Sequence, residues 1–272
     1  QFEGSQDNRL RHADIAHHND PALYLTNSAL LAEHVTFQGS FGNVLWGRSS
    51  SLVIRHCEFP DLPYGEHVRG DRLPPDGQWI FEGNTFGTTT GYADIIDISG
   101  GQRPGPILQV LNNVFRGGSD DGLDLDGTDA HIEGNVFMHF HKGNDSTSES
   151  SAISTGIYDG QVSRLTVVRN VFFDNDHDVL LKEGAHLEAA HNTSVGAIKA
   201  SVMINEPERP WETPPQGGWM EDSLIWNTAA VVGNLDTNLL QNGTWELAVR
   251  SSLLPQTGPW AGAGNLLDDP RL

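Results

Sequence analysis

The residues best suited to chemistry are concentrated in one short stretch, GSDDGLDLDG, at positions 118–127. Four of the seven residues from Asp120 to Asp126 are aspartates, and Asp129 follows just outside. Carboxylates this close repel one another, which raises their pKa values unless a positive charge lies between them. Clusters of carboxylate oxygens are natural sites for a hard cation, and Ca²⁺ suits them better than the geometrically stricter Mg²⁺. The stretch predicts a Ca²⁺ site, catalytic or purely structural, with a solvated acidic face as the alternative.

The chain is strongly acidic, which limits its partners. Its 272 residues include 36 Asp and Glu against 16 Lys and Arg, a net charge of −20. Such a surface repels nucleic acid and anionic membranes, so neither is an expected partner. There is no HExxH motif and no Cys/His cluster with zinc spacing, so the motifs give little support to a transition-metal site. A single cysteine, Cys57, excludes an internal disulfide.

The first residues, QFEGSQDNRL, are polar and do not resemble a signal peptide. No apolar run is long enough to cross a bilayer. We therefore expect a mature secreted, cell-surface or periplasmic protein of a bacterium, or an excised domain of a larger one.

A short phrase recurs along the chain and sets its organisation. It reads HVTF, HCEF, GNTF, NNVF, GNVF, RNVF and HNTS, ending at Phe37, Phe59, Phe86, Phe115, Phe137, Phe172 and Ser194. The intervals are 22, 27, 29, 22, 35 and 22 residues, which is typical of stacked coils with loops inserted between them. Alternating apolar and polar residues precede the phrases and predict short strands rather than helices. No change of composition marks a second domain, so residues 1–272 are predicted to form one solenoid, with inserted loops at 60–76, 142–150 and 206–219.

This pattern resembles the right-handed parallel β-helix of the pectate-lyase-like superfamily, over nearly the whole chain. The resemblance implies an all-β fold in which each coil carries three short strands. It also implies that the Asn of the phrase stacks into a ladder at a tight turn while the Phe points into the core. The ladder residues, Asn84, Asn113, Asn135, Asn170 and Asn192, are therefore expected to be scaffold.

Aligning the coils by this phrase places the acidic stretch in a column. IIDISGG (95–101) lies over GLDLDGT (122–128), with DVLLKEG (178–184) further along. Stacked coils are about 4.8 Å apart, so Asp97 is predicted to neighbour Asp124, and Asp94 to neighbour Asp121. Alternation buries Ile96, Ile98, Leu123, Leu125, Val179 and Leu181 and turns outward Asp97, Ser99, Asp124, Asp126, Leu180 and Lys182. One coil earlier, GEHVRGD is predicted to add His67 and Arg69 to the outward column.

An acid on one coil and D-D-x-x-D on the next resemble the calcium arrangement of pectate lyases of the ninth polysaccharide lyase family. The resemblance implies that Ca²⁺ is bound by Asp97, Asp120, Asp121 and Asp124, assisted by Asp94 or Asp126. It also implies a lysine base, for which Lys182 in the strand column is the first choice and Lys142 in a loop the second. Arg69 would bind the substrate carboxylate, and His67 would protonate the leaving oxygen.

These parts suit β-elimination from a polyuronate. The C5 proton of a uronic acid is too weakly acidic to remove while the carboxylate keeps its full charge, and Ca²⁺ on that carboxylate withdraws charge. A lysine with a lowered pKa then accepts the proton. Arg48, Arg103 and Asp178 are further substrate-binding candidates. Trp46, Trp211 and Trp219 offer rings that a glycan-binding module could stack on sugars, with anchoring in the core or in loops as the alternative. We expect a Ca²⁺-assisted polysaccharide lyase that acts on an acidic polysaccharide as a monomer.

Two other classes remain open. The adjacent pair Asp120–Asp121 is similar to the paired aspartates of β-helix polygalacturonases, and DNDHD (174–178) is similar to the DPHD of alginate epimerases without its proline. A glycoside hydrolase that uses paired carboxylates on a neutral polymer is therefore the first alternative. The GxGNLLDDPRL ending also resembles β-helix domains of large secreted bacterial proteins, so the second alternative is a module that binds glycan or is purely structural.

Overall fold

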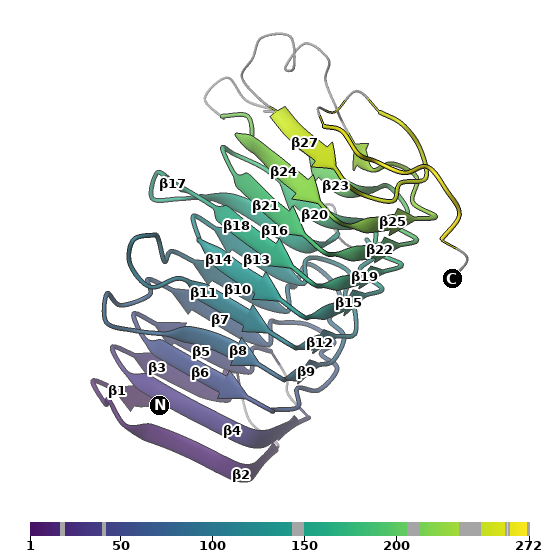
Figure 1. The fold of residues 1–272 in the computed structure, drawn as a ribbon. Helices are drawn as coiled ribbons and strands as arrows, with labels where there is room; N and C mark the ends of the chain where they lie inside the picture. Colours follow the sequence, from purple (N-terminus) through teal and green to yellow (C-terminus); the bar gives the residue numbers. More distant parts are fainter. Residues whose placement is uncertain are drawn as a thin grey trace.

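The chain winds into a parallel β-solenoid with three sheets along its length (Figure 1). A computed structural model of the protein describes residues 1–16, 20–39, 42–142, 150–205, 213–233, 246–258, 260 and 262–270. All strand pairs between successive coils in these ranges are parallel, and the described residues contain no helix. The all-β parallel β-helix expected from the repeated phrase is confirmed.

Sheets A and B take one strand from each successive coil, and sheet C does so from β9 to β25. Sheet A contains β1 (Phe2–Glu3), β3 (Leu23–Thr26), β5 (Leu45–Arg48), β7 (Val68–Asp71), β10 (Ile96–Ser99), β13 (Leu123–Asp126), β16 (Ser151–Tyr158), β20 (His177–Leu181), β23 (Ala200–Ile204) and β26 (Val232–Gly233). Sheet B contains β2 (Asn8–Ala16), β4 (Ala29–Gln38), β6 (Ser51–Arg55), β8 (Trp79–Glu82), β11 (Leu108–Leu111), β14 (Ala130–Glu133), β18 (Arg164–Val168), β21 (His186–Ala190), β24 (Gly217–Glu221) and β27 (Glu246–Arg250). Sheet C contains β9 (Thr85–Phe86), β12 (Val114–Phe115), β15 (Val136–Met138), β19 (Val171–Phe173), β22 (Thr193–Val195) and β25 (Leu224–Trp226), while β17 (Gln161–Val162) pairs antiparallel with β16.

Alternation along each strand separates the core from the outer face. In β13 the side chains of Leu123 and Leu125 are fully buried, while Asp124 and Asp126 lie on the outer face. The same period of two holds in β10, where Ile96 and Ile98 are buried. Because each strand pairs in register with the next coil, apolar residues stack on apolar residues along the whole interior.

The N-x-F phrase builds two internal ladders, as predicted. From Asn113 onward, the carboxamide oxygen of each ladder Asn accepts hydrogen bonds from the Asn one coil earlier, and Asn84 Oδ1 accepts from the Cys57 amide. Asn135 Oδ1, for example, accepts from Asn113 N at 2.8 Å and from Asn113 Nδ2 at 3.0 Å. The phenylalanines stack face to face, with ring centroids 4.5 Å apart for Phe115 and Phe137. The stack runs through Phe37, Phe59, Phe86, Phe115, Phe137 and Phe172. These residues are scaffold.

One expected loop is wrong. The segment 60–76 contains β7, which pairs with both β5 and β10, so it is part of a coil rather than an insertion alone. The segment 206–219 includes the start of β24 at Gly217, and its residues 206–212 lie outside the described residues, as do 143–149 of the segment 142–150. Within the described part of the chain, no helix has the length and apolar character needed to span a membrane.

Candidate metal centre

The acidic stretch lies on the outer face of sheet A, where neighbouring strands align its carboxylates. Asp97 on β10 pairs with Asp124 on β13, as predicted, and with Arg69 on β7. At the coil entrance, the Asp121 amide donates to Asp94 Oδ1 at 3.0 Å, so this pair is also adjacent as predicted. Register therefore brings together side chains that are 27 residues apart in the sequence.

Two groups of carboxylate oxygens are close enough to share a cation. One oxygen each from Glu66, Asp94 and Asp97 lies within 4.8 Å of the others, and so does one each from Asp94, Asp120 and Asp121. Two oxygens bound to the same Ca²⁺ at 2.3–2.6 Å are at most about 5 Å apart. The two groups have Asp94 in common and contain five residues. Together with Asp124 and Asp126 on the outer face of β13 they form the cluster that we call the acidic column: Glu66, Asp94, Asp97, Asp120, Asp121, Asp124 and Asp126.

Burial and mutual repulsion raise the pKa values of carboxyl groups in the acidic column. Burial, followed by the charge of Asp97, raises the pKa of Glu66 to about 7 even though Arg69 lowers it. The pKa of Asp97 rises to about 6 for the same reasons, with Asp124 the main neighbouring charge. Burial and Asp124 raise the pKa of Asp126 to about 7, and the pKa values of Asp94 and Asp121 are also raised. Such a site gains free energy from any cation that replaces the protons.

The donor set fits a hard cation. Every side-chain donor of the acidic column is a carboxylate oxygen, the ligand type that Ca²⁺ prefers. Three of these oxygens, Glu66 Oε2, Asp121 Oδ1 and Asp124 Oδ1, are buried and make no hydrogen bond. A buried carboxylate oxygen without a partner costs free energy, and a bound cation would remove that cost.

Two cationic side chains border the acidic column. Arg69 Nη2 lies 3.2 Å from Asp97 Oδ2, and its guanidinium packs over the ring of Trp46 at 5.7 Å. Burial tends to lower the pKa of Lys182, but the charges of Asp124, Asp121 and Asp126 outweigh it and raise that pKa. Lys182 is therefore next to the acidic column, as expected, and holds its proton while those carboxylates are ionised. Leu180, predicted to face outward beside it, is buried.

His67 does not face the acidic column, contrary to the prediction. Its side chain is completely buried, and its Nε2 lies 2.6 Å from the carbonyl oxygen of Pro60. The ring packs edge-on against Phe59 and Phe86. Burial lowers the pKa of His67 to about 4. The prediction from alternating residues was wrong because His67 lies before the first residue of β7. Outside a strand, successive side chains need not point to opposite faces, and this one points into the core.

Asp178 also lies inside the solenoid rather than on a substrate face. Ser194 donates a hydrogen bond to its Oδ2, and Asn175 Nδ2 donates to its Oδ1 at 3.1 Å. Burial raises its pKa to about 6 despite these bonds. The repeat explains why Asp178 can be buried. Ser194 occupies the position that holds Phe in the preceding coils, and the smaller side chain leaves room for the carboxyl group.

The remaining candidates lie at varied distances from the acidic column. Arg48 is on the outer face of sheet A, with its Nε 3.7 Å from Asp71 Oδ2. Arg103 pairs with the buried Asp129 at 3.2 Å and reaches towards sheet B, where Arg103 Nη1 donates to the Arg164 carbonyl. Lys142 is exposed, and its amide donates to Asp176 Oδ2 at 3.0 Å. Trp219 is on sheet B, and Trp211 lies outside the described residues.

Sequence reasoning missed Glu66. The signal was a spacing of three residues that recurs on successive coils: Glu66 before Arg69, Asp94 before Asp97, and Asp121 before Asp124. The first position of each pair enters the coil just before its strand and lies beside the same position of the next coil.

The raised pKa values predict that the metal-free protein loses stability as pH rises. The pKa values of Glu66, Asp97 and Asp126 are about 7, 6 and 7, against about 4 when unfolded, so the folded state binds more protons between these limits. Their stabilising contribution is complete below about pH 4 and is lost as pH rises through 6–7. After allowance for partial exposure, we expect the free energy of unfolding in chelator to fall by about 2 kcal/mol or more between pH 5 and pH 8.

Urea unfolding at the two pH values measures this change. Glu66→Gln should reduce the difference, since an amide does not titrate. Stability that rises steadily from pH 5 to pH 8 would contradict the assignment.

Comparisons with known proteins identify no family. No family model matches the chain, and no curated protein is similar to it in sequence. Among solved structures, the chain is similar to HetL, a pentapeptide repeat protein involved in heterocyst differentiation regulation from the cyanobacterium Nostoc sp. strain PCC 7120. The match has 11% identity and a TM-score of 0.30 and covers 95% of this chain and 86% of HetL. A likeness this weak carries no argument about function.

Proposed function

We propose that the protein is a Ca²⁺-assisted polysaccharide lyase of the pectate-lyase-like superfamily that cleaves a uronic-acid-containing polysaccharide by β-elimination. The observation that carries the proposal is the acidic column, in which aligned carboxylates with raised pKa values lie beside Arg69 and Lys182. A secreted or cell-surface bacterial protein, working as a monomer, belongs to the same proposal. The partner is an acidic polysaccharide.

The acidic column would hold the cation through Asp94 and its two groups of neighbours. When bound, Ca²⁺ would withdraw charge from a uronate carboxylate and make the proton on the adjacent carbon easier to remove. Neutralised carboxylates would also cease to raise the pKa of Lys182, while its burial would continue to lower it. Lys182 would thereby become a more effective base.

The side chains around the acidic column would supply the base and the groups that bind the substrate. Lys182 Nζ would accept the C5 proton of the sugar, and the Arg69 guanidinium would pair with a substrate carboxylate. Trp46 lies one coil before Arg69 and meets Tyr24 edge to face, with ring centroids 5.5 Å apart. These rings extend the outer face of sheet A with aromatic surface on which a sugar ring can stack.

A glycoside hydrolase is the second candidate, favoured by the pKa of Glu66. A carboxyl group with a pKa of about 7 is protonated near neutral pH and is suited to act as a general acid on a glycosidic oxygen. In that case a neighbouring ionised aspartate would be the base or nucleophile, and the metal would be unnecessary.

Calorimetric titration with Ca²⁺ tests the proposal first. The wild type should bind Ca²⁺, and Asp124→Asn should lose that binding, because the substitution removes a charge at the centre of the acidic column. Asp159→Asn is the matched control, since Asp159 is exposed at the β16–β17 turn. Absence of Ca²⁺ binding by the wild type would reject the lyase proposal.

Incubation with polyuronates then separates the candidate classes. A lyase releases unsaturated products that absorb ultraviolet light and stops working in chelator. A hydrolase releases reducing ends without that absorbance. A protein that retains glycan and releases nothing is a binding module.

A further inference from the structure

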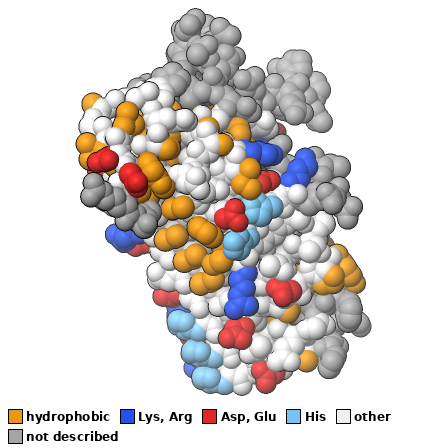
Figure 2. Space-filling model, turned by 90° about the vertical axis from the view of Figure 1, so that its right-hand side faces the viewer, with side chains coloured by type: hydrophobic (Ala, Val, Ile, Leu, Met, Phe, Trp, Pro, Cys, Tyr) orange, Lys and Arg blue, Asp and Glu red, His pale blue; other side chains and the backbone are white. Residues whose placement is uncertain are grey.

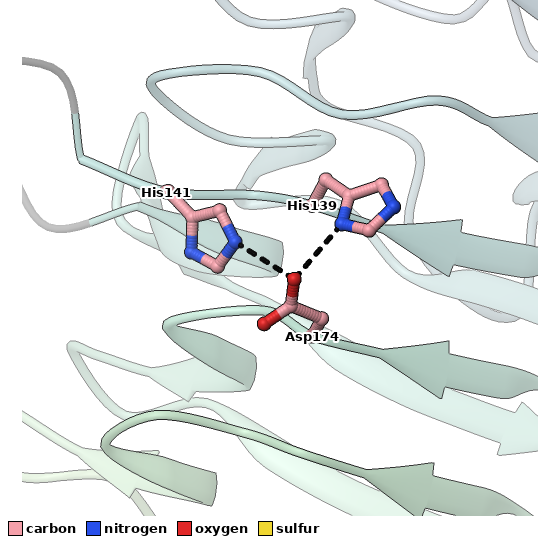
Figure 3. Close-up of side chains that lie close together, drawn as sticks. All are labelled: His139, His141 and Asp174. Atoms are coloured by element: carbon pink, nitrogen blue, oxygen red, sulfur yellow. Dashed lines mark hydrogen bonds and ion pairs between the residues drawn. The ribbon is translucent and has the colours of Figure 1, made fainter.

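A second cluster of metal-binding side chains lies outside the acidic column, where sheet C ends. His139 and His141 follow β15, and Asp174 follows β19 on the next coil (Figure 3). One ligand atom from each of the three lies within 4.8 Å of the others. Figure 2 shows histidine side chains next to acidic and apolar ones on this face of the molecule.

The distances fit a shared metal ion. His139 Nδ1 lies 3.0 Å and His141 Nε2 lies 3.5 Å from the same oxygen, Asp174 Oδ2. Ligand atoms bound to zinc at 2.0–2.1 Å in a tetrahedron are about 3.3 Å apart. Two of the three separations therefore already match a tetrahedral site, and one ligand atom from each of the three residues lies within 4.8 Å of the others.

A further carboxylate orients His141. Asp176 Oδ1 lies 3.1 Å from His141 Nδ1, and Asp176 Oδ2 accepts the amide of Lys142 at 3.0 Å. The Asp176 side chain is 10% exposed, so it is held firmly. Metal-binding histidines usually donate their second ring nitrogen to such a carboxylate, which fixes the ring and its tautomer.

A neutral His141 that donates to Asp176 would face Asp174 with a second acceptor, a contact that a cation would relieve. A neutral imidazole has one N–H, and in the tautomer with Nδ1 protonated that donor points to Asp176. The Nε2 lone pair then faces Asp174 Oδ2, which is also an acceptor. A positive charge between the two atoms turns this repulsion into attraction.

The turn after each sheet C strand places these side chains side by side. His139 and Asp174 have positive φ angles of 61° and 53°, and Gly117 and Gly196 occupy the equivalent places on the flanking coils. Positive φ recurs at other turns of this chain, for example at His34, His56 and Arg169, so the conformation belongs to the coil. What distinguishes this turn is that two successive coils carry a potential metal ligand there.

We propose that His139, His141 and Asp174 bind a divalent transition metal of the Zn²⁺ class, with Asp176 as a positioning residue. Imidazole nitrogens suit such a metal and do not suit Ca²⁺. The side chains of His139, His141 and Asp174 are 48%, 36% and 43% exposed, so the metal is open to solvent and keeps a position for an exchangeable ligand.

Titration of the 272-residue chain with Zn²⁺, and with Co²⁺ followed by visible absorption, tests the site. The wild type should bind one equivalent, and His141→Gln and Asp174→Asn should each weaken binding by roughly 100-fold or more. Asp176→Asn should weaken it by about 10–100-fold, as expected for a residue that orients a ligand. Circular dichroism establishes that each variant remains folded.

His34→Asn is the matched control. His34 stacks between His12 and His56, with centroids 4.9 and 5.1 Å away, and is the competing histidine group among the described residues. Binding should survive this change and also Asp124→Asn, which separates the site from the acidic column. No binding by the wild type, unchanged binding in folded His141→Gln and Asp174→Asn, or loss confined to His34→Asn would each overturn the proposal.

Discussion

Replacing Lys182 by alanine should lower the rate of Ca²⁺-dependent release of ultraviolet-absorbing products by about 10²–10⁴-fold, the usual contribution of a positioned general base. Lys182 is the lysine whose pKa responds to Asp121, Asp124 and Asp126, which places its ammonium beside the proposed metal. Ca²⁺ affinity should remain or increase in the variant, because a competing positive charge is removed. Initial rates at saturating polyuronate, with calorimetry for Ca²⁺, measure both effects.

Lys142→Ala is the control, since Lys142 is exposed and was the second choice of base. It should keep near-normal activity. If Lys142→Ala is inactive and Lys182→Ala is active, the base has been misassigned; if both are active, the lyase mechanism needs another base altogether.

Replacing Phe137 by alanine should destabilise the fold by about 3–5 kcal/mol. Phe137 is completely buried in the aromatic stack, with ring centroids 4.5 Å from Phe115 and 5.4 Å from Phe172. Its removal takes buried apolar surface out of the core and leaves a cavity between two coils. For a chain of this size the melting temperature should fall by about 10 °C, which differential scanning calorimetry measures.

Phe173→Ala provides the comparison for this result. Phe173 is 47% exposed on the outer face of sheet C and should tolerate the same substitution with a cost below about 1 kcal/mol. Equal losses for the two variants would show that the stack is not the main source of stability.

The scaffold could be predicted from the sequence because the repeated phrase corresponds to a repeated turn of the backbone. Asn suits a turn that exchanges hydrogen bonds with the coils on both sides, so the N-x-F phrase marks the central coils, while Cys57 and Ser223 take the same position in the coils that flank them. Once the phrase fixed the register, a period of two decided that Leu123 points inward and Asp124 outward. The adjacency of Asp97 and Asp124 followed from these rules alone.

The same rules failed where a residue lies outside a strand or where the repeat changes. His67 precedes β7, so alternation does not apply to it, and Pro60 and two phenylalanines hold it inside. Asp178 is buried because Ser194 replaces a phenylalanine, an effect transmitted from another part of the coil. The pKa values of the acidic column depend on burial by neighbouring coils, which no local pattern encodes.

The replacement of phenylalanine by Ser194 also ends the aromatic stack. Up to Phe172 the rings of successive coils stack on one another, whereas the next coil places Ser194 against the Asp178 carboxyl group. The asparagine ladder and the three sheets continue across this interface, so backbone and amide hydrogen bonds hold it without help from stacked rings. In a solenoid, cooperativity is transmitted only between neighbouring coils, so we expect backbone amides of the coils after Phe172 to exchange hydrogen faster than those of the coils before it.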